Sequence, residues 1–352
     1  MNPRRPRLLE AGLFLLVVGL PLAFFPLSEA AFVDVKLLVL ALGTLLVWTS
    51  GLPVDRRVVA PAVAFSATLV LAALFGVDPA ASLVGDLRPT ALTMLACAIP
   101  LVVVAPSIPD DLLARARGWF VGVAAAVSLV VLTEHVTPEL LDALAEDESF
   151  RGATFGNPVL LAGFLAAAIP AALARAEDSR WRTILAFAAL GSGFAVIGER
   201  SAYLLPVVAF VAAWWFVRPD RRRLWAAAGV MVLTFGAWIV APDPSATGSA
   251  TDPGRVAGQF GTFAAERDRI AVWGAQTQAV FDRPVLGWGP GNEWSAFIAS
   301  GTPGQIETAT RFWADAHNLV IEIAVVAGLA GLAAFGWLLV RLVPRAVAFS
   351  TI

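Results

Sequence analysis

Ten long apolar stretches recur along the chain, and they constrain its fold more than any other feature. An α-helix needs about 20 mostly apolar residues to cross the ~30 Å hydrocarbon core of a bilayer. Hydrophobic residues make up 58% of the 352 residues and charged residues only 15%, whereas soluble domains average about 45–50% and 25%. The sequence therefore predicts an all-α integral membrane protein with transmembrane spans at 8–26, 32–50, 58–76, 90–106, 117–133, 158–175, 182–198, 202–217, 224–241 and 318–341.

Charge distribution predicts the orientation of these spans. Most of the 25 basic residues lie in the N-terminal segment and in the loops that share its side, for example Arg4, Arg5 and the run 221–223. Cytoplasmic loops of membrane proteins are enriched in Lys and Arg. We therefore expect a multi-pass protein with a cytoplasmic N-terminus.

The loops divide the chain into three regions. Residues 1–241 carry nine predicted spans, and residues 318–352 carry the tenth span and a short tail, so the chain is expected to be truncated or minimal. Residues 242–317 form a long extracytoplasmic loop, and loops of that length usually serve a function or are disordered. The stretch FAAERDRIAVWGAQTQAVF within it predicts an amphipathic helix on or above the membrane.

Residue counts exclude several kinds of site. Cys97 is the only cysteine, and His135 and His317 are the only histidines. A disulfide within one chain and a metal site built from several cysteines or histidines are therefore excluded. We expect no metal, no cofactor and no nucleic acid partner.

Polar residues gather near the predicted outer ends of the spans. Arginine binds phosphate oxygens in a bidentate manner and stays charged at any working pH, and histidine accepts a proton near neutral pH. A single arginine at a span end often only extends to the lipid headgroups. Several arginines together with a histidine therefore indicate a binding site better than any one of them does. The group predicts a site for a lipid-linked diphosphate, formed by Arg88, Arg151, Arg200, Arg267, Arg269 and His317.

Several motifs, taken in their order, resemble the bacterial O-antigen ligase and polymerase family. They are RGATFGNPVLLAGFL with its Asn157-Pro, GERSAYL with Arg200, RIAVWGAQTQAVFDRPVLGWGPGNEWSAF, and HNLVIEIAVVAGLAGLAAF, and the opening PLAFFPLSEAAFVDVKLLVL is also similar. The chain departs from the family at Glu199, where a serine is usual, and in having two fewer spans. Gly287, Gly289 and Gly291 lack the context of a phosphate loop, so we interpret them as a tight turn with Trp288 at the membrane interface.

The resemblance implies an integral-membrane glycosyltransferase in the bacterial cytoplasmic membrane, with an extracytoplasmic site. Its donor would be a glycan on undecaprenyl diphosphate, and its acceptor a hydroxyl of lipid A-core, another surface anchor or a glycan. Arg151, Arg200 and Arg269 would bind the diphosphate, with Arg267 and Arg88 as further candidates, and His317 would be the general base. Asn157, Asn318, Glu199 and Glu322 would support them. We expect Glu322 to pair with an arginine rather than to transfer a proton.

Three other functions remain open from the sequence. A polysaccharide polymerase with the same donor is not separated from a ligase by these motifs. A transporter or flippase for lipid-linked sugars is disfavoured, because such proteins often contain repeats and helices broken at mid-depth, and no repeat is evident here. A peptidoglycan polymerase would depend on an acidic residue in the large loop, and the arginine and histidine pattern fits it less well.

Overall fold

The chain is described by a computed structural model in which every regular element is helical. It describes residues 4–24, 34–84, 91–137, 154–155, 157–174, 180–197, 200–240, 264–308 and 318–349. No strand occurs within these ranges. The prediction of an all-α fold is therefore confirmed.

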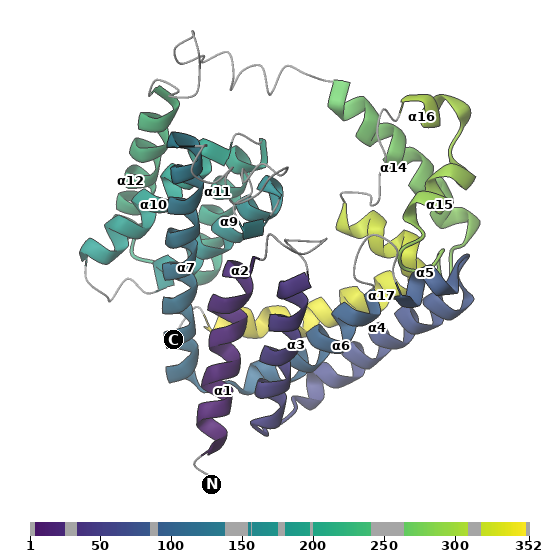
Figure 1. Ribbon diagram of the computed structural model, residues 1–352, viewed down its shortest axis with the longest axis horizontal. Helices are drawn as coiled ribbons and strands as arrows, with labels where there is room; N and C mark the ends of the chain where they lie inside the picture. Colours follow the sequence, from purple (N-terminus) through teal and green to yellow (C-terminus); the bar gives the residue numbers. More distant parts are fainter. Residues whose placement is uncertain are drawn as a thin grey trace. The chain divides into compact units, whose positions relative to one another are not determined.

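The chain forms two compact units (Figure 1), each of which is considered by itself. The first unit contains residues 1–51, 108–261 and 347–352, and the second contains residues 52–107 and 262–346. The sequence predicts a different division, into transmembrane regions (1–241 and 318–352) and a large loop (242–317). The compact units do not test that division, so it stays a prediction.

The first unit is a bundle of long helices joined by short breaks. Two of its segments, η1 and η4, are π-helical turns that continue an α-helix. The elements are α1 (Arg4–Phe14), η1 (Leu15–Gly19), α2 (Leu20–Leu22), α3 (Asp34–Thr49), α7 (Asp110–Val136), α9 (Pro158–Ala174), α10 (Arg180–Ile197), α11 (Arg200–Ala212), η4 (Ala213–Val217) and α12 (Arg221–Val240).

The second unit combines three long apolar helices with the helices of the large loop. The elements are α4 (Arg56–Phe75), α5 (Pro79–Val84), α6 (Ala91–Val104), the 3₁₀ turn η2 (Ala105–Ser107), α14 (Ala264–Asp282), α15 (Glu293–Ser300), α16 (Pro303–Thr308) and α17 (Leu319–Phe349). The helix expected in the large loop is present as α14.

Each of the ten ranges predicted as spans coincides with a helical segment. By length and apolar composition, three described helices are able to cross a membrane: Arg56–Phe75, Asp110–Val136 and Leu319–Leu342. Shorter apolar helices cover Val35–Thr49, Ala96–Ser107, Pro158–Ala174 and Ala202–Val217. The chain is thus an integral membrane protein in character, and the count of ten crossings stays a prediction.

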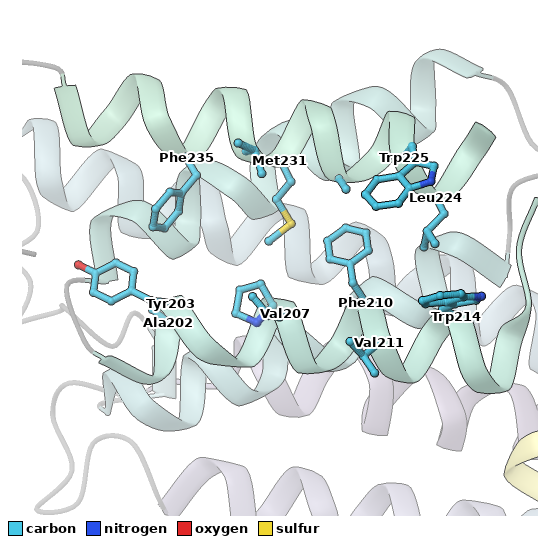
Figure 2. A pocket seen from close by; sticks show the side chains of 13 residues that line it. Ala202, Tyr203, Val207, Phe210, Val211, Trp214, Leu224, Trp225, Met231 and Phe235 are labelled. Carbon is cyan, nitrogen blue, oxygen red and sulfur yellow. The ribbon is translucent and has the colours of Figure 1, made fainter. Parts of the chain in front are cut away.

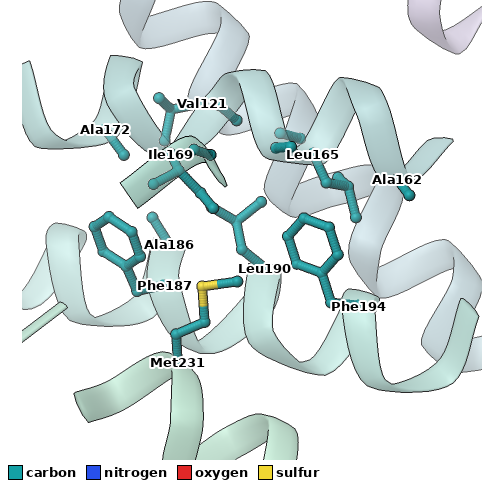
Figure 3. Packing of buried hydrophobic residues seen from close by; sticks show 14 of the residues in the cluster. Val121, Ala162, Leu165, Ile169, Ala172, Ala186, Phe187, Leu190, Phe194 and Met231 are labelled. Carbon is teal, nitrogen blue, oxygen red and sulfur yellow. The ribbon is translucent and has the colours of Figure 1, made fainter. Parts of the chain in front are cut away.

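Apolar side chains from α7, α9, α10 and α12 form the core of the first unit (Figure 3). Phe187, Leu190 and Phe194 follow one face of α10 and are fully buried against Leu165 and Ile169 of α9. Burying a side chain of this size stabilises the fold by about 1.5–3 kcal/mol. This face therefore fixes α10 at the centre of the unit.

Glycine allows two helix pairs of the first unit to approach closely. A Cβ at Gly191 of α10 would lie 2.8 Å from the Met231 carbonyl oxygen of α12. A Cβ at Gly12 of α1 would lie 2.9 Å from the Gly43 oxygen of α3, and these helices lie side by side in Figure 1. Small residues at helix contacts are typical of membrane bundles.

Candidate functional site

Two asparagines of the predicted site cap the helices that follow them. Asn157 Oδ1 accepts hydrogen bonds from the Val159 and Leu160 amides at 2.8 and 3.4 Å, at the start of α9. Asn318 Oδ1 accepts from Val320 and Ile321 at 3.1 and 3.4 Å, at the start of α17. An asparagine in this position satisfies amides that have no partner within the helix. Both residues therefore have a structural role that explains their place in the motifs.

The short turn at residues 154–155, just after Arg151, is held by two elements of the first unit. Lys36 Nζ of α3 donates to the Thr154 carbonyl oxygen and lies 5.7 Å from the centre of the Phe155 ring. Thr154 Oγ1 donates to the carbonyl oxygen of Pro21 in α2 at 2.5 Å. These contacts hold Thr154 and Phe155 against α2 and α3.

Helix α14 of the second unit carries Arg267 and Arg269, and Arg269 begins the stretch RIAVW. Arg269 is exposed, and within the described part of the chain its guanidinium forms no ion pair. A neighbouring face of α14 is buried through Val272, Ala275 and Ala279, and it packs against α15 and α16. The apolar face of α14 is thus covered by other helices of the large loop, and the Arg269 side chain stays exposed.

A hydrogen-bonded contact joins the ends of α14 and α15. The Ser300 hydroxyl donates to Asp282 Oδ2 at 2.5 Å, and the Gln278 amide donates to Oδ1 at 3.1 Å. The hydrogen bond from Ser300, and to a smaller extent that from Gln278, hold the pKa of Asp282 below its ordinary value. The carboxylate therefore closes the α14–α15 hairpin.

Helix α17, which His317 and Asn318 precede, is broken at Gly328. This glycine has φ 66° and ψ −172°, which is not helical. In an unbroken helix the amides of Leu329 and Ala330 would donate to the carbonyl oxygens of Val325 and Val326. The break separates these four groups, and each then needs another partner, because unsatisfied backbone is costly in a membrane.

The segment from Arg283 to Gly291, which we call the glycine-rich loop, supplies all four partners. The amides of Trp288 and Gly289 donate to the oxygens of Val325 and Val326 at 2.8 and 3.1 Å. In return, the amides of Leu329 and Ala330 donate to the oxygens of Pro284 and Val285 at 2.8 and 3.4 Å. The loop therefore supplies new partners for the four groups of two helical hydrogen bonds that span the break.

Glycine is required on both sides of this contact. Gly287 and Gly289 have φ of 70° and 93°, a region that favours glycine. A Cβ at Gly287 would lie 2.7 Å from the Gly328 nitrogen, and one at Gly328 would lie 2.7 Å from the Leu286 nitrogen. The glycine spacing thus serves close backbone approach. The tight turn expected from the sequence is present.

The expectation that Trp288 is an interfacial anchor is wrong. Its side chain is 8% exposed and packs with Ala279, Ala296 and Val325. Its indole Nε1 donates to the Ala279 carbonyl oxygen at 2.9 Å, and the Arg283 guanidinium lies 5.0 Å from the ring centre. The tryptophan is thus part of the core of the second unit.

Asn292, a residue that the sequence analysis did not single out, fastens this loop to α5. Its side chain is 2% exposed, and Nδ2 donates to Ser82 Oγ at 2.9 Å. The Val77 amide, which follows α4, also donates to the Trp288 carbonyl oxygen at 3.0 Å. The glycine-rich loop therefore connects α4, α5, α14 and α17. An isolated asparagine after a glycine turn gives no sequence signal for this role.

Two further polar residues were missed. Lys36 is the only lysine and lies near the start of a predicted span, where an ionisable residue is a functional candidate by default. That signal was sufficient to find it. Gln276 of α14 is fully buried, and within the described part of the chain its amide oxygen and nitrogen have no hydrogen-bond partner. Its sequence context resembles that of any polar residue on an amphipathic helix.

The other predicted site residues are only partly placed. Arg200 is the first residue of α11 instead of lying in the turn before it, and of Arg200 and Arg267 only the backbone is described. Glu322 is half-buried in the first turn of α17. Outside the described residues lie Arg88, Arg151, Glu199 and His317.

Comparison with known protein families gives one match, to a family described as O-antigen ligase, over residues 184–336. Neither the curated proteins nor the solved structures gave a match. The matched segment is less than half of the chain; it begins within α10 and ends within α17. It includes Arg200, Arg269, the glycine-rich loop, the break at Gly328 and His317. Residues 184–336 are therefore similar to the O-antigen ligase family.

Proposed function

We propose that this protein is an O-antigen ligase-like glycosyltransferase of the bacterial cytoplasmic membrane. It transfers a glycan from undecaprenyl diphosphate to an acceptor hydroxyl, on lipid A-core or another surface anchor, at the extracytoplasmic face. The observation that carries the proposal is the family match over residues 184–336, which contains three of the predicted arginines and the predicted base. A ligase- or polymerase-type function follows from the family, and the donor and acceptor named here are our proposal.

In the proposed reaction, His317 accepts the proton of the acceptor hydroxyl as its oxygen attacks the anomeric carbon of the glycan. The bond from that carbon to the diphosphate oxygen breaks, and the diphosphate leaves with the bonding electrons. Arg151, Arg200 and Arg269 bind its oxygens and stabilise the charge that develops. Arg269 supports this role because it is exposed and carries no ion pair in the described part of the chain.

The break in α17 bears on the transporter alternative. Broken helices at mid-depth in transporters present free backbone groups to the substrate or coupling ion. At Gly328, by contrast, the carbonyls of Val325 and Val326 and the amides of Leu329 and Ala330 are bonded to the glycine-rich loop. The loop's own amides at Trp288 and Gly289 are likewise occupied, so they are not free to bind phosphate. This arrangement supports a structural break rather than a transport site.

Glycan transfer by the purified full chain tests the proposal. The protein in detergent receives an undecaprenyl diphosphate-linked oligosaccharide, a lipid A-core acceptor and EDTA. We expect transfer to survive EDTA and to fall about 100-fold or more in His317→Ala, Arg200→Ala and Arg269→Ala, because each removes a group acting in the transition state. A product that lengthens the lipid-linked glycan instead would identify a polymerase.

Matched substitutions control for the loss of a side chain alone. His135→Ala removes the other histidine, whose ring lies edge-on to Trp238 with 6.2 Å between ring centres. Arg182→Ala removes an exposed arginine at the start of α10. Both are expected to retain transfer. Equal activity in the His317 and His135 variants would refute the assigned base, and donor movement across liposomes without transfer would identify a transporter.

A further inference from the structure

An apolar groove runs between the two consecutive helices α11 and α12 of the first unit (Figure 2). Its volume is about 450 Å³, which is within the range of small-molecule sites. Tyr203 and Phe235 lie at one end and Trp214 and Trp225 at the other, with Phe210 and Met231 between them. The groove therefore follows most of the length of α11.

The groove exists because its two walls are held by different helices. Helix α11 packs on α9, and α12 packs on α10. Apolar side chains on the facing surfaces remain open, for example Val207 (61% exposed) and Val232 (69% exposed). An exposed apolar surface of this kind marks a site for another apolar group.

Arginines continue one wall of the groove beyond its tryptophan end. Trp225, Ala228, Val232 and Phe235 of α12 line the groove at the spacing of one helical face. Arg221 lies four residues before Trp225 and thus on the same face, one turn further out.

Arg221 belongs to a group of exposed arginines with little acidic compensation. Arg218, Arg221, Arg222 and Arg223 are all exposed and form no ion pair with any described residue. Asp220 lies among them, and its carboxylate accepts the Arg222 backbone amide at 3.4 Å. The tryptophan end of the groove is therefore positively charged and requires an anion.

We propose that this groove binds one acyl chain of an anionic phospholipid, whose headgroup phosphate is bound by Arg221. From Ala202 to Trp214 the groove wall measures about 18 Å at 1.5 Å per residue. That length is close to one leaflet, half of the ~30 Å hydrocarbon core. The arginine end is cytoplasmic by the charge distribution, and the cytoplasmic leaflet is the anionic one. The occupant therefore differs from the glycan donor, and the inference does not depend on the proposed reaction.

Lipid retention measured by native mass spectrometry tests the proposal. The purified full chain is incubated with equal amounts of dioleoyl phosphatidylglycerol and dioleoyl phosphatidylcholine, which share their chains and differ in charge. We expect preferential retention of phosphatidylglycerol, reduced about five-fold by Arg221→Gln, since one basic residue near an anionic membrane surface contributes about that factor. Ala228→Phe, which fills the groove, is expected to abolish retention of this lipid.

Two variants with the same chemistry on the other face of α12 are the controls. Arg223→Gln and Ala226→Phe lie two residues from Arg221 and Ala228, about 200° around the helix. Both are expected to retain phosphatidylglycerol better than their partners. Equal loss in the Arg221 and Arg223 variants would show diffuse attraction only and would overturn the proposal. So would undecaprenyl phosphate, added as a third lipid, if it displaced phosphatidylglycerol from the groove.

Discussion

Each of the two compact units is stabilised by a different kind of internal contact. In the first unit, helices pack through apolar side chains and glycines, as where Gly191 of α10 meets α12. In the second unit, a loop packs its backbone against the backbone of the broken helix α17. The difference shows that one chain satisfies the membrane's demand for paired backbone groups in two ways, within helices and between a helix and a loop.

The two kinds of contact should also differ in how well they tolerate an added side-chain atom. Contacts between side chains adjust by rotamer changes, whereas contacts between backbones hardly adjust at all. A methyl group added at a helical glycine of the first unit should cost less than one added at Gly328, where a φ of 66° adds backbone strain to the close contacts. Glycine substitutions measure this difference directly, because each adds one Cβ at a known place.

Gly328→Ala is expected to have the largest effect. The residue needs φ 66° with ψ −172°, and a Cβ would lie 2.7 Å from the Leu286 nitrogen. Strain at such a position costs about 1–3 kcal/mol before any clash is counted, so we expect a total loss of about 3 kcal/mol or more. Thermal unfolding of the purified protein in detergent measures it.

Gly336→Ala is the matched control for that variant. It lies two turns further along α17, and nothing stands within 4 Å of an added Cβ. Alanine is favoured over glycine inside a helix by up to about 1 kcal/mol, so stability should be unchanged or raised. If both variants unfolded at the same temperature, the glycine-rich loop would not be holding the break.

Gly191→Ala is expected to have an intermediate effect. The added Cβ would meet the Thr234 hydroxyl and lie 2.8 Å from the Met231 carbonyl oxygen. The hydroxyl can rotate away while the carbonyl cannot, so we expect a loss of about 1–3 kcal/mol, as for overpacked cores. Gly229→Ala on α12, with nothing within 4 Å, is the control. A loss as large as that of Gly328→Ala would remove the contrast between the units.

The helices of both units were predictable from hydropathy, because each apolar stretch coincides with a helical segment. The break in α17 was not, since Gly328 lies in the uniformly apolar run VVAGLAGLAAF. Glycine is common in membrane helices that are unbroken. Nothing local distinguishes Gly328 from Gly336, and only the distant glycine-rich loop determines which of them breaks the helix.

The candidate site was predictable only where residue type implies chemistry. The arginines were found because phosphate binding favours them, and Arg269 is placed on an exposed face of the predicted helix. Trp288 was assigned to the membrane interface because that is where most membrane tryptophans lie. Its burial depends on packing with Ala279, Ala296 and Val325, the last of which is 37 residues away in sequence, and no pattern around Trp288 shows these contacts.

The two capping asparagines provide the smallest and most symmetrical comparison. Asn157 and Asn318 each accept two amides, one at the start of α9 and one at the start of α17. Replacing such a cap by alanine costs about 1 kcal/mol, and aspartate or serine restores most of it. We therefore expect equal losses in thermal stability for Asn157→Ala and Asn318→Ala, both rescued by Ser. Glycan transfer then distinguishes the two: if Asn318→Ser recovers stability but not transfer while Asn157→Ser recovers both, Asn318 does more than cap α17 beside His317. Recovery of both in each variant would mean that the asparagine of the His-Asn pair acts only on the backbone.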